Sequence, residues 1–198
     1  MNPRALLLPL LLAAAGCATE DTAPAPAAPA APAAPAAPAA PAAPSAPQEV
    51  ARFLLEARAG SALRGGGAFS RLPDGRIRLV MEVEGVEPGL HAAHIHEHGD
   101  CSDPKAASAG GHWNPTGKPH GKWGQADGAF HLGDLGNIEV GADGNGRLQI
   151  ETDLWTVGDG GPNDVVGRSI IVHAKPDDFT TQPTGNAGDR IGCGAIAK

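Results

Sequence analysis

All eight histidines of this chain fall between His91 and His173, and this clustering constrains the fold more than any other feature. His94 and His96 flank Ile95 in an apolar stretch, and on a β-strand such i and i+2 side chains share a face. His173 closes a second apolar run that begins at Ser169 and also predicts a strand. A single His-x-His pair is more often solvated, but solvated histidines have no reason to gather in loops held between strands. The joint pattern therefore indicates metal sites.

A second cluster lies in a stretch rich in glycine and proline, between Gly110 and Gly136. Its members are three histidines and one aspartate: His112, His120, His131 and Asp134. Three imidazoles and one carboxylate match the ligand types and the ligand number of a tetrahedral zinc site. Imidazole also suits copper in both of its oxidation states. The residues predict two adjacent metal sites, one for copper and one for zinc.

Six segments of the chain resemble, in the same order, the copper/zinc superoxide dismutase family. They are Gly89 to Glu97, Gly110 to Pro115, His120 to Gly121, His131 to Asn137, Val172 to His173, and Gly185 to Gly194. The similarity covers residues 50–197. It implies that copper is held by His94, His96, His112 and His173, and that zinc is held by His112, His120, His131 and Asp134. His112 would belong to both sets, which requires its ring to lose both protons between two cations.

The resemblance also implies an activity and further site residues. Two superoxide anions would be converted to dioxygen and hydrogen peroxide, with copper as the redox metal and zinc as a fixed charge. His112 would deliver a proton to the departing peroxide, and the Arg190 guanidinium would bind the anion. Asp177 would hydrogen-bond His94 and His120 and so fix their rings. Lys175 and Thr184 would lie at the mouth of the substrate channel.

The three cysteines have different expected roles. The resemblance pairs Cys101 with Cys193 in a disulfide, although a reduced pair would fit a cytoplasmic location. Residues 1–16 contain Arg4 and then an apolar run, which is typical of a secretory signal. The residues from Ala14 to Cys17 resemble a bacterial lipoprotein box. A lipid at Cys17 would anchor an exported protein in the cell envelope or periplasm, whereas ordinary cleavage between Ala13 and Ala18 would release it with one spare thiol.

Residues 17–48 form a predicted linker that cannot pack a core. From Pro26 to Pro47 proline recurs at every third residue, separated almost entirely by alanine. Polyproline II has three residues per turn, so the segment is either a stiff spacer or a linker of no preferred length.

Residues 49–198 make one domain, and alternating apolar residues predict eight strands in it. We expect them at Val50 to Ala57, Gly67 to Leu72, Arg76 to Glu84, Ala92 to Glu97, Leu135 to Val140, Arg147 to Asp153, Arg168 to His173 and Arg190 to Ile196. Turn sequences around Pro73 and Gly144 join adjacent strands. The fold class is all-β, an eight-stranded Greek-key sandwich or flattened barrel. Two long loops, His98 to Asp134 and Ala174 to Asp189, would carry the site.

Other functions and assemblies need weighing. A net charge of −7, no tyrosine and no basic stripe argue against a nucleic-acid partner. The alternative function is an envelope lipoprotein that sequesters copper and zinc without turnover. The resemblance allows either a monomer or a homodimer. Ala92 stands where the family usually has glycine, and a positive φ there would strain the backbone.

Overall fold

The computed structural model describes residues 46–198, so the predicted signal peptide, Cys17 and nearly all of the linker lie outside the described residues. Residues 46–198 form eight strands and one short 3-10 helix. The strands are β1 (Gln48–Ala57), β2 (Arg64–Arg71), β3 (Ile77–Glu84), β4 (Gly89–His96), β5 (Asp134–Val140), β6 (Gly146–Thr152), β7 (Ser169–His173) and β8 (Arg190–Ala195), and the helix is η1 (Ala107–Ala109). All eight predicted strands are confirmed, with ends shifted by up to three residues.

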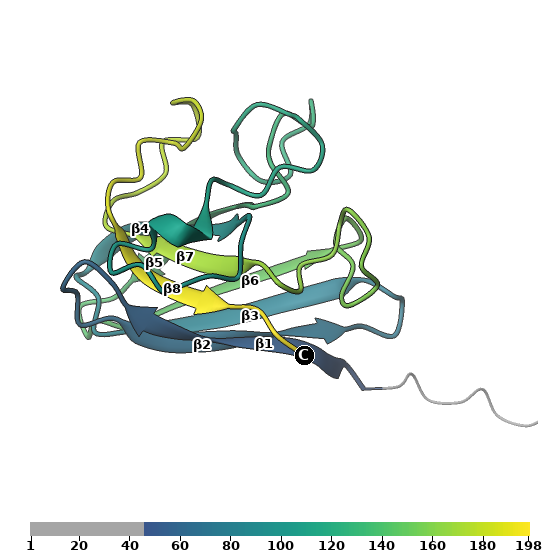
Figure 1. The fold of residues 1–198 in the computed structure, drawn as a ribbon, viewed down its shortest axis with the longest axis horizontal. Helices are drawn as coiled ribbons and strands as arrows, with labels where there is room; N and C mark the ends of the chain where they lie inside the picture. The colour runs from purple at the N-terminus through teal and green to yellow at the C-terminus, as the bar shows by residue number, and fades with distance from the viewer. Residues whose placement is uncertain (1–45) are drawn as a thin grey trace, which may run out of the picture. The chain divides into compact units, whose positions relative to one another are not determined.

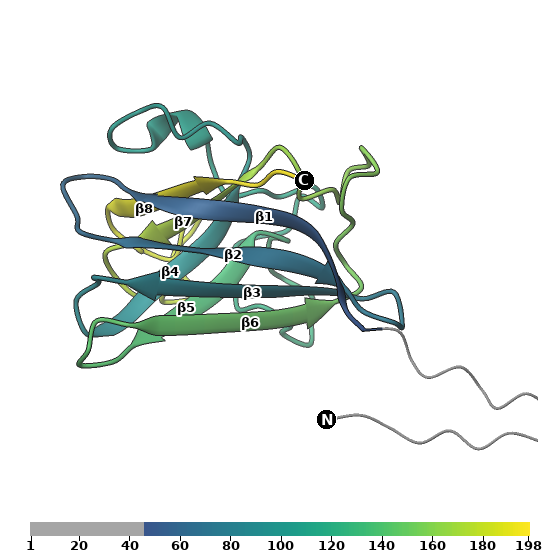
Figure 2. The same ribbon diagram turned by 90° about the horizontal axis from the view of Figure 1, so that it is seen from below.

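The strands close into an antiparallel barrel in the order β1-β2-β3-β6-β5-β4-β7-β8. Strand β3 pairs with β6, and β4 pairs with β7, so each of these strands has a neighbour that is distant in the chain. Figures 1 and 2 show the barrel flattened into two layers, with β1, β2, β3 and β6 in one and β5, β4, β7 and β8 in the other. The predicted all-β, eight-stranded fold is confirmed.

Side-chain alternation explains the barrel core. In β1 the buried positions are Ala51, Phe53 and Leu55, and in β3 they are Ile77, Leu79, Met81 and Val83. Strand β7 differs, because all five of its residues are buried. Its Ile170 and Val172 face the main core, whereas Ile171 packs with Cys193, Ala106 and Ala109 in a second small cluster. A strand covered on both sides reads as a continuous apolar run, as this one does.

Glycines account for one of the two largest differences from the predicted boundaries; the other is β4, which also begins three residues early. Strand β2 begins at Arg64, three residues earlier than expected, because Gly65, Gly66 and Gly67 pair with both β1 and β3. A Cβ at any of the three would run into a backbone carbonyl of Phe53, Val80 or Glu82. The sequence interpretation began the strand only at Gly67, the last of these glycines. All three let neighbouring backbones approach closely.

Three long connections leave the barrel. The segments between β4 and β5 and between β7 and β8 are the two predicted loops, and both stand above the barrel in Figure 1. A third, between β6 and β7, received no role from the sequence. Its Asp164 is buried and accepts hydrogen bonds from the backbone N–H groups of Gly158, Gly160 and Val166. That carboxylate fixes the shape of the third loop from within, because all three donors belong to the same loop.

Cys101 and Cys193 form a disulfide, with Cα atoms 5.8 Å apart and a sequence separation of 92. The bond confirms the predicted pairing and ties the first long loop to β8. Within residues 46–198, no helix has the length and apolar character needed to cross a membrane.

Candidate metal centre

Four buried histidines from three parts of the fold form the first group. His94 and His96 lie on β4, His173 ends the neighbouring strand β7, and His112 lies on the first loop, where it forms a β-bridge with His96. One ligand atom from each residue lies within 4.8 Å of the others. The pairing of β4 with β7 therefore brings together histidines that are far apart in sequence.

Each ring in this group has one nitrogen held and one nitrogen free. The held atoms are His94 Nε2, 2.9 Å from Asp177; His96 Nδ1, 3.0 Å from the Gly110 carbonyl; His112 Nδ1, 2.9 Å from Asp134; and His173 Nδ1, 3.3 Å from the Gly188 carbonyl. The four opposite nitrogens are buried and have no hydrogen-bond partner among residues 46–198. Buried polar atoms without partners are rare in folded proteins. Four such atoms converging on one point fit a copper ion held by nitrogen ligands.

The second group surrounds one carboxylate oxygen. The Nδ1 atoms of His112, His120 and His131 lie 2.9, 3.0 and 3.1 Å from Asp134 Oδ1. The other oxygen, Oδ2, accepts the backbone N–H groups of Gly121 and His131 at 3.1 and 2.8 Å. Three ring nitrogens cannot all share one oxygen with good geometry, and His120 Nδ1 makes no hydrogen bond within the described residues. Three nitrogens and one oxygen fit a tetrahedral zinc ion.

His112 is common to both groups. Its Nδ1 faces Asp134, and its free Nε2 faces the first group. Burial lowers the pKa of His112 to about 4 and outweighs the opposing effect of Asp134. Burial also holds the pKa values of His96 and His173 well below the ordinary value. These rings are therefore neutral near pH 7, which is the form that binds a metal.

In the second group, the charged forms of the side chains are favoured instead of the neutral forms. Burial opposes ionisation of Asp134, but the nearby rings of His112, His120 and His131 and the backbone N–H of His131 keep its pKa far below the usual range. Burial would likewise lower the pKa of His120, yet Asp134 and Asp177 raise it to about 9. Asp134 therefore stays ionised, and its buried negative charge favours a cation beside it.

Asp177 lies between the two groups, as the sequence predicted. Its Oδ2 is 2.9 Å from His94 Nε2, and its Oδ1 is 2.9 Å from His120 Nε2. Sequence reasoning missed Asn137 on β5, whose amide donates to the Asp177 carbonyl at 3.0 Å and accepts the Asp177 N–H at 2.7 Å. The available signal was the position of Asn137 at the end of the His131 to Asn137 segment.

A second missed residue, Gln182, connects the two long loops. Its Oε1 accepts the backbone N–H of His120, and its Nε2 donates to the His120 carbonyl, both at 2.8 Å. The side chain of a residue on the second loop thereby fixes the backbone of a predicted zinc ligand on the first. Nothing in the sequence pattern marked this contact.

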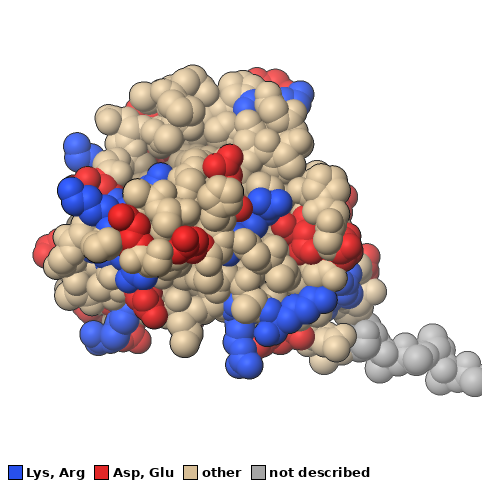
Figure 3. All heavy atoms as spheres, in the orientation of Figure 1, with Lys and Arg blue, Asp and Glu red and all other residues tan. Residues whose placement is uncertain are grey.

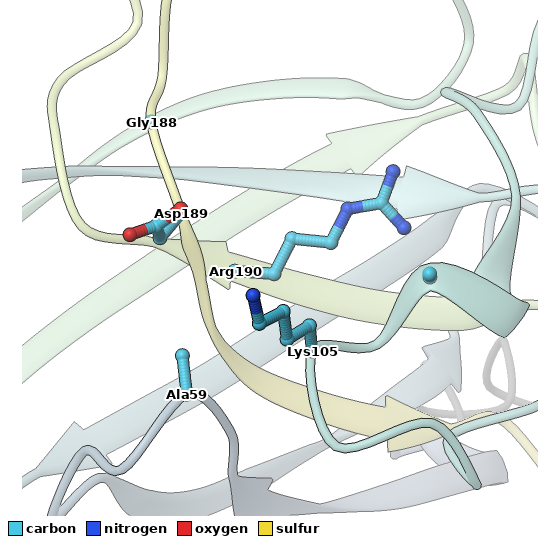
Figure 4. Close-up of a pocket in the computed structure, with 6 residues that line it drawn as sticks. Ala59, Lys105, Gly188, Asp189 and Arg190 are labelled. Carbon is cyan, nitrogen blue, oxygen red and sulfur yellow. The ribbon is translucent and has the colours of Figure 1, made fainter.

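Arg190, at the start of β8, lies beside the first group. Its guanidinium donates to the carbonyls of Ala106 at 2.6 Å and Gly110 at 2.8 Å. The Gly110 carbonyl also lies 3.0 Å from His96 Nδ1, so a predicted copper ligand and Arg190 share one acceptor. Figure 4 shows Lys105, which the sequence interpretation did not select, rising beside the Arg190 side chain in the same pocket, while Asp189 points away from the guanidinium.

The remaining candidates lie outside the two groups. Lys175 and Thr184 are exposed on the second loop, and their role at a channel mouth stays a prediction. His91 faces the carbonyls of His173 and Glu87 at 2.9 and 2.8 Å, and His98 is exposed. Ala92 is not among the described residues with positive φ, so the expected strain does not arise.

The geometry agrees with comparisons to known proteins. A family profile described as "Copper/zinc superoxide dismutase (SODC)" matches residues 64–196. The chain belongs to the copper/zinc superoxide dismutase family. It is 45% identical over 128 residues to "Superoxide dismutase [Cu-Zn]" from Onchocerca volvulus, and the match covers 60% of this chain and 78% of the relative. Membership makes the protein an oxidoreductase with copper and zinc as its cofactors.

The fold also matches a solved structure, "Crystal Structure Analysis of the clock protein EA4". The TM-score is 0.66 at 31% sequence identity, and the match covers 76% of this chain and 95% of that one.

Proposed function

We propose that this protein converts two superoxide anions and two protons into dioxygen and hydrogen peroxide, and that it does so in the cell envelope. The observation that carries the proposal is the double use of His112. Its Nδ1 lies in one four-residue group and its Nε2 in the other. A protein that merely stored two metals would have no need to join both sites through one ring and to place Arg190 beside them.

The metals supply what the side chains lack: copper exchanges single electrons when bound by His94, His96, His112 and His173, and zinc adds a fixed charge when bound by His112, His120, His131 and Asp134. Arg190 supplies the binding site for the anion. Two backbone carbonyls hold its guanidinium in place, and a fixed cation stabilises negative charge without reorganising.

His112 supplies the proton. Its ring is fixed at Nδ1 beside Asp134, and its Nε2 is buried with no hydrogen-bond partner in residues 46–198. The atom can hold a proton at the place where peroxide forms and then release it. Positioned general acids of this kind contribute about 10² to 10⁴ in rate.

The local charge favours an anionic substrate although the whole chain is acidic. The formal net charge is −7, and Figure 3 shows acids and bases interspersed over the barrel, with the two upper loops largely uncharged in this view. Lys105 and Arg190 place two cations in one pocket next to the metal centre. Local cations of this kind can steer an anion to a site despite an unfavourable total charge.

We also propose that the protein is exported and anchored through a lipid at Cys17. Two observations support this location. The apolar run before Cys17 is typical of a secretory signal, and the Cys101–Cys193 disulfide is a kind of bond that persists in oxidising compartments. Incorporation of labelled palmitate that is lost in Cys17→Ser would support the anchor. Fractionation of the wild-type protein with the cytoplasm would overturn it.

A homodimer would require an exposed apolar face. Leu54 on β1 is 78% exposed, which makes the outer face of that strand our candidate. Light scattering of the wild-type protein and of Leu54→Lys tests it. A mass near 20 kDa for both would show a monomer.

The activity test uses the full chain loaded with copper and zinc. We expect fast superoxide dismutation in the wild type, its loss in His96→Ala, and a sharp drop in Arg190→Ala. Arg64→Ala is the matched control, because Arg64 is exposed on β2 and pairs only with Glu84 in the described structure. Stoichiometric metal binding without turnover would overturn the proposal and favour metal sequestration.

A further inference from the structure

The turn after β1, residues 58–61, is hydrogen-bonded to the first loop beside the disulfide. Arg58 donates from both Nε, at 3.1 Å, and Nη2, at 2.5 Å, to the carbonyl of Cys101. The next residue, Ala59, donates its backbone N–H to the Pro104 carbonyl at 3.1 Å. Two consecutive residues of the turn thus fix two carbonyls of the loop.

The same turn is also hydrogen-bonded to the start of β8. The Ile191 carbonyl accepts the backbone N–H of Arg58 at 2.9 Å and the hydroxyl of Ser61 at 2.6 Å. Ile191 directly follows Arg190, so the backbone that carries the Arg190 side chain is held from this side as well.

These contacts are connected to the guanidinium of Arg190 through the first loop. Its two acceptors, Ala106 and Gly110, belong to the loop that Arg58 and Ala59 hold, and Ala106 lies only two residues after Pro104. Figure 4 shows Ala59, Lys105 and Arg190 around one pocket. A shift of the Cys101 to Pro104 backbone would therefore move the carbonyls that aim Arg190.

Arg58 is suited to this task by its burial. Its side chain is 13% exposed, and its charge is balanced by Glu56, 3.0 Å away and 73% exposed. A third N–H group, at Nη1, donates to the Ala57 carbonyl at 2.7 Å. The disulfide fixes the side chain of Cys101, whereas Arg58 fixes its carbonyl, so the two constraints act on different atoms of the same residue.

We propose that Arg58 is a positioning residue for Arg190, and that it sets the affinity of the metal centre for anions. The proposal rests on the proposed function, in which Arg190 binds the substrate anion. Arg58 acts through the Cys101 to Gly110 segment and does not itself touch the substrate.

The test measures azide binding to the full-length protein loaded with copper and zinc. Binding is monitored through the change in the visible spectrum of the copper. Truncation of Arg58 leaves the Cys101 carbonyl without its donors, and we expect Arg58→Ala to weaken azide binding about tenfold, the size of one charge-assisted hydrogen bond. Arg58→Lys should recover part of the loss, because it keeps one donor. Arg64→Ala, the exposed control, should bind azide as the wild type does.

A double-variant cycle separates positioning from a general loss of structure. If Arg58 acts through Arg190, then Arg58→Ala combined with Arg190→Ala should bind azide no more weakly than Arg190→Ala alone. Metal content and thermal midpoint are measured on every variant. If Arg58→Ala does not fold, Arg58→Lys and Arg58→Gln carry the same cycle.

Two results would overturn the proposal: unchanged azide affinity in folded Arg58 variants, or additive effects in the double variant. Its failure is distinguishable from that of the proposed function, because azide binding requires no turnover. Weakened azide binding in a protein without dismutase activity would leave the positioning role standing and remove the dismutase.

Discussion

The two halves of the metal centre are built in different ways. Three of the four histidines in the copper group lie on the paired strands β4 and β7, and their free nitrogens have no partner in residues 46–198. The zinc group comes from residues 112–134 alone and is organised by hydrogen bonds around Asp134. The barrel therefore preforms the copper site, whereas the zinc site depends on the first loop and on the contacts that hold it.

The largest expected effect comes from removing the residue that both halves share. His112→Ala deletes a ligand of each group and the proposed proton donor, so we expect turnover to fall by about 10² to 10⁴. Stopped-flow decay of superoxide measures it, with the exposed His98→Ala as control. Turnover within a factor of two of wild type would remove His112 from the mechanism.

A smaller change should separate the halves. In Asp177→Asn the amide N–H₂ faces a ring N–H that the carboxylate formerly accepted, so either His94 or His120 loses its orientation. We expect zinc affinity to fall about 10- to 100-fold, the usual cost of losing an outer-shell partner, with a smaller loss for copper.

Competition with a chromogenic chelator measures both affinities, and Asp178→Asn is the control because its carboxylate bonds only Thr180 and Thr181 in the described structure. Equal losses for the two metals would contradict the difference drawn between strand-built and loop-built sites.

The pH dependence of the metal-free protein tests the same contrast. His96, His112 and His173 have lowered pKa values, so below pH 6.5 the unfolded chain takes up protons that the folded chain does not, and stability falls by about 1.4 kcal/mol per pH unit for each histidine. His120 has a raised pKa, so its contribution is complete below 6.5 and is lost as the pH rises through about 9.

We therefore expect the stability of the metal-free protein to be greatest near pH 6.5. Urea unfolding at pH 5.5, 6.5 and 8.5 measures it. A free energy of unfolding that rises from pH 6.5 to 5.5 would show that the copper-group histidines are not held neutral.

The smallest effect should come from the contact between the loops. Gln182→Ala removes both hydrogen bonds to the His120 backbone, but the side chain is exposed and water can replace them in part. We expect zinc release to quicken about fivefold with copper retention unchanged. Gln149→Ala on β6 is the matched exposed control, and an unchanged rate of zinc release would limit Gln182 to a passive contact.

Sequence and structure agree where the signal is local or belongs to the family pattern. The alternation in β1 and β3 and the apolar run of β7 predicted the strands. The histidine clusters predicted two metal sites, and the family resemblance assigned their members, including the shared His112. Asn137, Gln182 and Arg58 were not found, because each bonds backbone 40 to 62 residues away, and no periodicity records the path of a loop.

The start of β2 shows a different limit. Gly65 and Gly66 have the composition of a turn, and only the pairing with the two neighbouring strands makes them part of β2. Tertiary contact overrode local propensity there.

Asp177 touches one ring of each group, and His112 belongs to both. The two metals must therefore be thermodynamically linked. If bound zinc changes the affinity for copper by a certain factor, bound copper must change the affinity for zinc by the same factor. The reason is that the coupling free energy belongs to the pair of sites. The order in which the metals are loaded can change the rate of assembly, but not the final occupancy at equilibrium.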